Sequence, residues 1–222
     1  MAVVVGVASV QMRAYFSSYH LWAAEHFAWL AQEAESQPGP VFKIQHRAYV
    51  TNAVLSAVAF LEASINEVFD DVADGHPSYV ASLSDDTKRL LGGLWTGHES
   101  VERWRILDKY GVALLCAGKP LFDKGAQPYQ DASLLVRLRN RLIHARPKTR
   151  ESGDTDTLEL CLSTRFPSNR LMANMANPYF PDKCLGAACS EWAVLSARAF
   201  ADEFFSRLGT RPNYQAVDFG PP

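Results

Sequence analysis

The chain has 222 residues, of which 48% are hydrophobic, 21% are charged and 11% are aromatic. This composition excludes a largely disordered chain and fits a single domain with a well-buried core. The formal net charge of −2 excludes a protein that is basic over its whole surface. Any contact with a nucleic acid would therefore need a local basic patch.

The N-terminal residues, the apolar stretches and the cysteines indicate the cellular compartment of the protein. Residues 1–7 are apolar, but no Lys or Arg precedes them and the run is short, which does not fit a signal peptide. The longest charge-free apolar stretch in a helical context, roughly 52–61, is about half of the ~20 residues that a membrane span needs. We therefore expect a cytoplasmic protein without membrane contact. We also expect reduced thiols at Cys116, Cys161, Cys184 and Cys189.

Helical periodicity dominates the first third of the chain. Apolar residues recur every three or four positions between Phe16 and Ala34, and the Pro/Gly-rich segment 36–40 then breaks the helix. The predicted buried stripe of this helix is Phe16, Tyr19, Ala23, Phe27, Leu30 and Ala34. A second apolar stripe from Val50 to Val72 predicts a longer helix that stops at 75–77. Two amphipathic helices with a short link favour an antiparallel pair.

The middle of the chain is less regular. Ser84 has the character of an N-cap for a short helix, which we expect to end at Gly92–Gly93. The segment Thr96–Glu99 has capping-box spacing and predicts the start of another helix that extends to Leu114. A turn-rich connection follows at 119–128.

A further helix is predicted at 130–144, ended by Pro147. Polar residues then predict a mobile loop at 145–156. The alternation of apolar and polar residues at 157–163 suits one short strand, for which the sequence offers no pairing partner.

The last predicted helix covers 187–208, with Gly209 as its stop. The chain is therefore expected to be all-α, an up-and-down bundle of about five main helices in one domain spanning 1–222. Its core is expected at about 15–208, with 209–222 as a tail.

The most unusual stretch is 137–150, which holds six of the 22 Lys and Arg residues and no acidic residue. One interpretation is a solvated helix end, since cations near a C-terminus complement the helix dipole. The competing interpretation is an anion site, above all for phosphate. The six cations are Arg137, Arg139, Arg141, Arg146, Lys148 and Arg150.

Helix geometry sorts these residues by face. Four side chains share one face within about 100° of the helix circumference. Arg139 lies about 140° from His144, so an ideal helix does not place the two side by side. Three arrangements would bring Arg139 and His144 to one site. The long side chain of Arg139 would extend around the helix, the helix would unwind near His144, or a dimer interface would complete the site. The four that share a face are Arg137, Asn140, Arg141 and His144.

The pattern Arg139-Asn140-x3-His144 at the end of an amphipathic helix resembles the signature of the HEPN (higher eukaryotes and prokaryotes nucleotide-binding) superfamily. That signature is Arg, four to six residues and then His, often with a polar residue after the Arg. The pairs Arg13–His20 and Arg137–His144 also fit the bare spacing, so spacing alone carries little. Asn140, the surrounding helix and the Pro147 that follows strengthen the match.

The resemblance implies a helical bundle and, for many members of the superfamily, a metal-independent endoribonuclease that acts as a toxin or defence effector. It also implies a homodimer whose two motifs face each other, RNA as substrate, and control by an antitoxin or a neighbouring-gene partner. No cofactor or metal is expected. The catalytic residues would be Arg139, Asn140 and His144. Backbone phosphates would be bound by Arg137, Arg141, Arg146, Lys148 and Arg150.

The chemistry suits these residue types. RNA can be cleaved by attack of its own 2′-hydroxyl on the adjacent phosphate, which needs a group that exchanges protons near neutral pH, as His144 could. Arg139 would face the extra negative charge of the phosphorane, and Asn140 would orient a phosphate oxygen or the His144 ring. The resemblance implies a 2′,3′-cyclic phosphate and a 5′-hydroxyl as products.

Structural alternatives stay open for each residue. His144 could cap helix carbonyls, and Arg139 could pair with Glu62 or Asp131. The whole chain could be a non-catalytic HEPN-like module that dimerises or binds a partner. Four tryptophans are expected in the core or at a dimer interface, where an exposed one could stack a base. They are Trp22, Trp29, Trp104 and Trp192.

Overall fold

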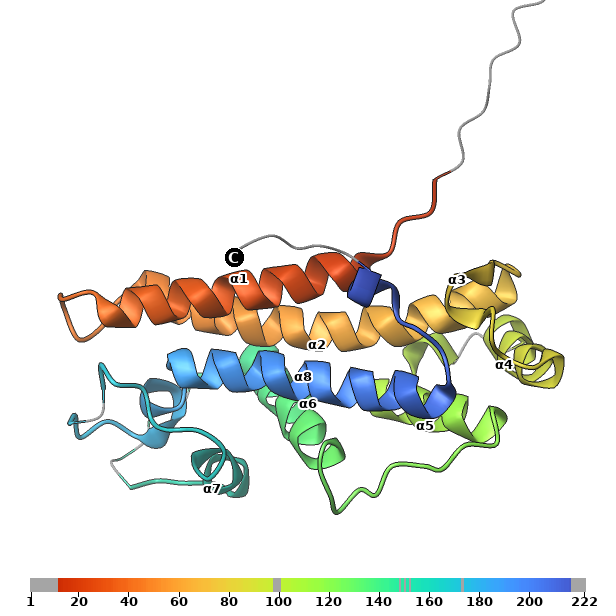
Figure 1. Cartoon of the computed structure of the whole chain (residues 1–222). Helices are drawn as coiled ribbons and strands as arrows, with labels where there is room; N and C mark the ends of the chain where they lie inside the picture. Colours follow the sequence, from red (N-terminus) through yellow and green to blue (C-terminus); the bar gives the residue numbers. More distant parts are fainter. Residues whose placement is uncertain are drawn as a thin grey trace, which may run out of the picture.

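The protein is all-α, as predicted. The computed structural model in Figure 1 describes residues 12–97, 101–147, 149, 151, 153–172 and 174–216. Helices account for most of these residues, and no strand occurs among them.

Three long helices form the body of the molecule. α1 (Phe16–Ser36) and α2 (Ile44–Ala73) are an antiparallel pair joined by a short link, and α8 (Ala187–Leu208) packs along both of them (Figure 1). α8 ends at Gly209, which adopts the left-handed conformation with φ +80°. The helices predicted at both ends of the chain are confirmed.

The remaining elements surround this body. α6 (Tyr129–Ile143) crosses α8 obliquely (Figure 1), packs against α2 and α8, and contacts α7 (Thr157–Ser163). The short elements are α3 (Pro77–Val80), η1 (Val101–Arg103), α7 (Thr157–Ser163), η2 (Tyr179–Lys183) and η3 (Asn213–Ala216). The longer ones are α4 (Asp85–Gly97), α5 (Ile106–Cys116) and α6 (Tyr129–Ile143).

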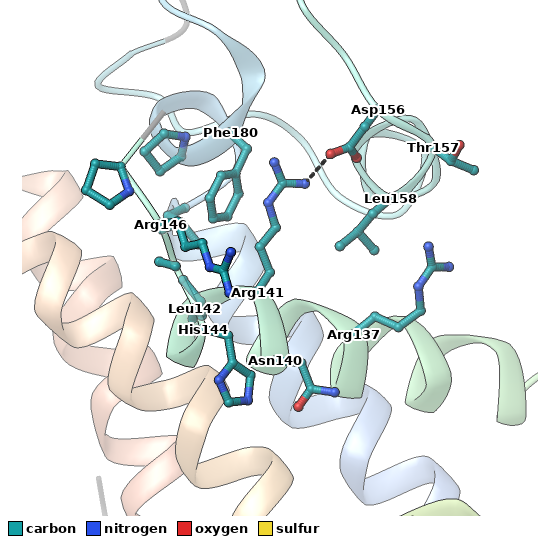
Figure 2. A pocket seen from close by; sticks show the side chains of 14 residues that line it. Arg137, Asn140, Arg141, Leu142, His144, Arg146, Asp156, Thr157, Leu158 and Phe180 are labelled. Carbon is teal, nitrogen blue, oxygen red and sulfur yellow. Dashed lines mark hydrogen bonds and ion pairs between the residues drawn. The ribbon is translucent and has the colours of Figure 1, made fainter. Parts of the chain in front are cut away.

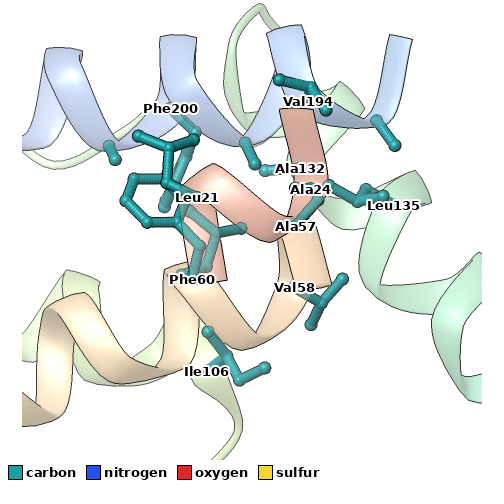
Figure 3. Packing of buried hydrophobic residues seen from close by; sticks show 14 of the residues in the cluster. Leu21, Ala24, Ala57, Val58, Phe60, Ile106, Ala132, Leu135, Val194 and Phe200 are labelled. Carbon is teal, nitrogen blue, oxygen red and sulfur yellow. The ribbon is translucent and has the colours of Figure 1, made fainter. Parts of the chain in front are cut away.

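The centre of the core lies where α1, α2, α6 and α8 meet (Figure 3). Ala24 of α1 and Ala57 of α2 are fully buried, and their small side chains let the two helices approach closely. Phe200 of α8 and Leu135 of α6 fill the adjoining space and are also fully buried. This packing fixes α6, the helix that carries the basic cluster, against the body of the bundle.

The face of α1 that is buried differs from the predicted stripe. Leu21, Ala24 and Ala31 are fully buried, whereas Phe16 and Tyr19 are exposed. α1 carries apolar residues on both sides, so periodicity alone could not select the side that packs. The stripe predicted for α2 is confirmed, because its members from Val50 to Val68 are buried.

A glutamate of α1 caps the first turn of α8. Glu35 Oε1 accepts a hydrogen bond of 2.7 Å from the backbone N–H of Ala187 and lies 3.1 Å from His46 Nε2. The N-cap residue of α8 is Gly186, where an added Cβ would lie 2.6 Å from Asn169 Cα. A residue distant in the sequence therefore satisfies a backbone donor that the local chain leaves unpaired.

α2 is long and apolar enough to cross a membrane by length and composition, and half of its most apolar window is buried inside the bundle. The charge-free stretch 52–61 is only part of this helix. Because α1, α4, α6 and α8 all pack against α2, it forms the core helix of the bundle.

The strand predicted at 157–163 is wrong, since these residues form α7. Asp156 caps the helix by accepting a 3.1 Å hydrogen bond from the backbone N–H of Glu159. Leu158 and Leu162, four residues apart, are buried, while Leu160 between them is exposed. These residues form a helix and not a strand because the described residues contain no second strand with which a strand could pair. The spacing of four between the two buried leucines fits a helix.

The predicted boundaries in the middle of the chain are also wrong. α4 continues through Gly92–Gly93 to Gly97, and Gly92 packs closely on Val72 of α2. Thr96 is not a cap, because its hydroxyl donates to the carbonyl of Gly92 within the same helix. Ser84 does cap α4 by accepting from the backbone N–H of Thr87. The next α-helix begins only at Ile106, and 98–100 lie outside the described residues.

The core extends beyond residue 208, which corrects the predicted tail. Tyr214 of η3 is buried, its ring lies 4.9 Å from that of Phe60, and its hydroxyl donates to Asp202. The last part of the predicted tail, 217–222, lies outside the described residues. In the predicted loop 145–156, the part of the chain that the structure describes forms no helix or strand.

Candidate functional site

An open pocket of about 900 Å³ lies beside the C-terminal half of α6 (Figure 2). α6 forms one wall, the start of α7 a second, and η2 with Leu185 a third. The lining residues of α6 and the segment after it are Arg137, Asn140, Arg141, Leu142, His144, Ala145, Arg146 and Pro147. Those from the other walls are Asp156, Thr157, Leu158, Phe180, Pro181 and Leu185.

One face of α6 presents its polar side chains to this pocket. Arg137, Asn140 and His144 follow one another at steps of three and four, are exposed, and all line the pocket. Arg141 lines it as well, which confirms the predicted grouping on one face. A regular helix up to Ile143 is sufficient to produce this arrangement.

His144 is the C-cap residue of α6. Its backbone N–H donates to the carbonyl of Asn140 at 2.9 Å, while its ring is exposed and forms no hydrogen bond within the part of the chain that the structure describes. Capping of helix carbonyls by the ring is therefore not observed. The imidazole remains accessible to a molecule that enters the pocket.

Arg139 lies on a different side of α6 and is not part of the pocket wall. Its Nη2 atom is 3.8 Å from Glu62 Oε2 on α2, which is one of the two alternatives derived from the sequence. The other, Asp131, pairs with Arg165 at 3.1 Å. The pair with Glu62 is long and partly exposed, a class worth about 0–1 kcal/mol. One chain thus brings Asn140 and His144 together but leaves Arg139 outside.

Arg141 is held by three groups. Its Nη1 lies 2.7 Å from Asp156 Oδ2 and its guanidinium carbon lies 4.1 Å from the centre of the Phe180 ring (Figure 2). Its Nη2 lies 2.6 Å from Glu159 Oε1. Glu159 is fully buried. The charge of Arg141 is compensated within the chain by these two carboxylates, and its role as a phosphate contact stays a prediction. It connects α6 to α7 and η2.

The cations that remain at the pocket are Arg137 and Arg146. Both are exposed, and neither forms an ion pair with any residue that the structure describes. Lys148 and Arg150, also predicted to bind phosphates, lie outside the described residues. The pocket is thus lined by two guanidinium groups without an ion pair among the described residues and by the exposed imidazole of His144.

The wall formed by η2 and Leu185 is apolar and includes Phe180, which no sequence pattern identified. Arg47 at the start of α2 holds this segment, donating to the Pro181 carbonyl at 2.6 Å and to Asp182 at 2.9 Å. Phe180 belongs to a stretch without periodicity, so no pattern in the sequence identified it. An apolar wall next to cations can accept a ligand that is partly apolar and partly anionic.

The described residues contain no group of three or more His, Cys, Asp or Glu side chains that could hold a metal ion. All four cysteines are free, and two of them, Cys184 and Cys189, are buried.

Comparisons of the chain with family models, with curated proteins and with solved structures found no match. The resemblance to the HEPN superfamily therefore depends on the residues of the chain itself.

Proposed function

We propose that the protein is a metal-independent endoribonuclease of the HEPN type that cleaves RNA in the pocket beside α6. The observation that carries the proposal is the exposed group Arg137, Asn140 and His144 on one helix face, with no acidic partner for Arg137 among the described residues. Arg137 and His144 are separated by six residues, which satisfies only the bare spacing of the signature, because Leu138 and not a polar residue follows Arg137. Arg137 thus replaces Arg139 as the proposed catalytic cation within one chain.

The proposed reaction balances without a cofactor. His144 takes the proton of the 2′-hydroxyl, the 2′-oxygen bonds to phosphorus, and the bond from phosphorus to the 5′-oxygen breaks. The leaving 5′-oxygen takes a proton from water, and the hydroxide that remains removes the proton from His144. The products are a 2′,3′-cyclic phosphate and a 5′-hydroxyl, and the imidazole is again neutral. Arg137 stabilises the charge that develops on the phosphorane, and Asn140 orients a phosphate oxygen.

The shape of the pocket supports an RNA substrate. Its volume of about 900 Å³ is large enough for a nucleotide. Leu158 and the face of Phe180 that is not stacked on Arg141 can contact an unpaired base, while Arg137 and Arg146 attract the phosphates. Further properties follow from the resemblance alone: a bacterial toxin or defence effector in the cytoplasm, paired with an antitoxin or neighbouring-gene product.

The test is cleavage of a labelled single-stranded RNA in EDTA by the wild-type protein and by His144→Ala. We expect the wild type to produce 2′,3′-cyclic phosphate ends and the variant to lose at least a hundredfold in single-turnover rate. His20→Ala, on α1, is the control and should cleave like the wild type. Equal rates for wild type and His144→Ala, or no cleavage by either protein, would contradict the proposal.

A second candidate is a non-catalytic HEPN-like module that binds a partner. The observation in its favour is that Arg139 and Arg141 are both paired with carboxylates, which leaves fewer cations for phosphate. This candidate predicts no cleavage under any of the conditions above. It also predicts that His144→Ala keeps the partner binding of the wild type.

A further inference from the structure

A second cavity, of about 520 Å³, lies at the other end of α6 from the candidate ribonuclease site and is here called the α8 cavity. Its walls are the segment that leads into α6, the segment that follows α7, and the first half of α8. Among the described residues, none lines both cavities. The volume is in the range of sites for small molecules, about 300–1,000 Å³.

The α8 cavity is lined by two aromatic rings. Trp192 and Phe166 are buried, and their ring centroids lie 5.2 Å apart with planes inclined by 44°. Leu195, one turn after Trp192 on α8, also lines the cavity and is 59% exposed. An exposed leucine next to two rings gives a concave surface from which an apolar ligand can displace water.

The indole N–H of Trp192 lacks an acceptor. Its Nε1 atom is shielded from water and forms no hydrogen bond with any residue that the structure describes. A buried donor without an acceptor is unfavourable, and native structures leave few of them. Because the neighbouring Leu195 is exposed, its side chain can change rotamer when a ligand enters. The donor therefore favours a ligand that carries a hydroxyl or carbonyl oxygen.

The charges at the α8 cavity disfavour an anion. The guanidinium of Arg165 lies 3.1 Å from Asp131 Oδ1 and donates to Gln130 Oε1 at 3.1 Å, so its charge is compensated. Glu191 lines the cavity, is exposed, and forms no ion pair with a residue that the structure describes. A carboxylate without an ion pair beside a compensated guanidinium leaves the local charge negative, which attracts a cation.

We propose that the α8 cavity binds a small aromatic amine. The ring of the ligand packs against Trp192 and Leu195, its ammonium group pairs with Glu191, and its oxygen accepts from the indole N–H. This site goes beyond the proposed ribonuclease function. Because the described linings of the two cavities share no residue, the failure of one proposal leaves the other standing.

The test uses tyramine, which has an aromatic ring, a hydroxyl oxygen and an ammonium group. In ¹⁵N-labelled protein each of the five tryptophans gives one indole N–H resonance, and Trp192→Phe identifies the resonance of Trp192. Tyramine should shift this resonance saturably, with a Kd of about 1–10 mM for a ligand of this size. The indole resonances of Trp95 and Trp104, which do not line the cavity, should stay in place.

Matched ligands separate the two polar contacts. The anion 4-hydroxyphenylacetate has the same ring and chain length as tyramine and should bind about tenfold more weakly, because its carboxylate meets Glu191. Phenethylamine lacks the hydroxyl oxygen and should bind about threefold more weakly than tyramine.

A matched pair of variants tests the carboxylate. Glu191→Gln should weaken tyramine about threefold and reduce its advantage over 4-hydroxyphenylacetate. Glu33→Gln removes another exposed glutamate, on α1, and should bind both ligands like the wild type. Backbone amide resonances away from the cavity would show that each variant is folded.

Three results would overturn the proposal. The first is a Trp192 resonance that tyramine leaves in place. The second is equal binding of tyramine and 4-hydroxyphenylacetate by the wild type. The third is a folded Glu191→Gln variant that binds tyramine as the wild type does.

Discussion

Arg141 of α6 and Glu159 of α7 form an ion pair of 2.6 Å in which the carboxylate is fully buried. The pair ties the helix that carries the candidate site to the short helix that forms its second wall. Stacking of Arg141 on Phe180 extends the tie to η2. The shape of the pocket thus depends on a residue that its position in the sequence had marked as a ligand contact.

Replacing Arg141 should therefore affect stability more than RNA affinity. Arg141→Ala leaves Glu159 buried without this partner, and we expect the free energy of unfolding to fall by about 3 kcal/mol. Arg141→Lys keeps the charge but neither the bidentate contact nor the stacking. Its free energy of unfolding should therefore fall by an intermediate amount. Urea unfolding followed by circular dichroism measures both. A loss below ~0.5 kcal/mol for Arg141→Ala would show that the pair is not structural.

The two arginines that fit the HEPN spacing can be separated by their effect on cleavage. Because Arg137 lines the pocket and Arg139 faces Glu62, Arg137→Ala should lower the single-turnover rate about a hundredfold. Arg139→Ala should change it less than about threefold, as expected of a partly exposed ion pair. The reverse order would return the catalytic role to Arg139.

The salt dependence of RNA binding is a second test of which arginines contact the phosphates. The slope of log K against log salt for a single-stranded RNA should become less steep by about 0.7 in each of the variants Arg137→Ala and Arg146→Ala. Arg139→Ala should retain the wild-type slope because its side chain is directed to α2. Filter binding of RNA between 50 and 200 mM salt would measure these slopes. Unchanged slopes in all three variants would place the RNA on another surface.

Glu35 should make stability depend on pH. Burial by itself would raise its pKa, but hydrogen bonds from His46 and from the backbone N–H of Ala187 hold the pKa of Glu35 below its usual value. Its contribution is then present above the ordinary glutamate pKa of about 4.3 and is lost as the pH falls through the lower folded-state value. The free energies of unfolding of the wild type and Glu35→Gln should therefore differ by a constant amount above about pH 5.5 and converge at acidic pH. If the difference in the free energy of unfolding increased as the pH fell, the direction assigned to the pKa shift of Glu35 would be wrong.

Gly186 should not tolerate a side chain. A Cβ there would lie 2.6 Å from Asn169 Cα and 2.9 Å from Glu35 Oε1, so Gly186→Ala should cost about 1–3 kcal/mol. The control is Gly111→Ala in α5, where a Cβ would meet nothing within 4 Å. This control should stabilise the protein by up to about 1 kcal/mol, because alanine is the better helix former. Calorimetry of both variants compares the two effects.

Local patterns were sufficient for the long helices and for the polar face of α6. Apolar residues repeated every three or four positions predict α2. The same helix geometry groups Arg137, Asn140 and His144 on one side of α6. Local patterns were insufficient at 157–163, where alternating leucines fit a strand and a helix equally well. The burial of Leu158 and Leu162 against the bundle decided for the helix.

The sequence by itself determined an all-α chain and the cluster of cations near the end of α6, because helix periodicity and charge are properties of neighbouring residues. Only the tertiary structure decided which cations remain uncompensated: it pairs Arg141 with Glu159 and directs Arg139 to Glu62, each on another helix. It also decided that α1 buries Ala24 and leaves Trp22 exposed. These outcomes depend on contacts between residues distant along the chain, which no local spacing specifies.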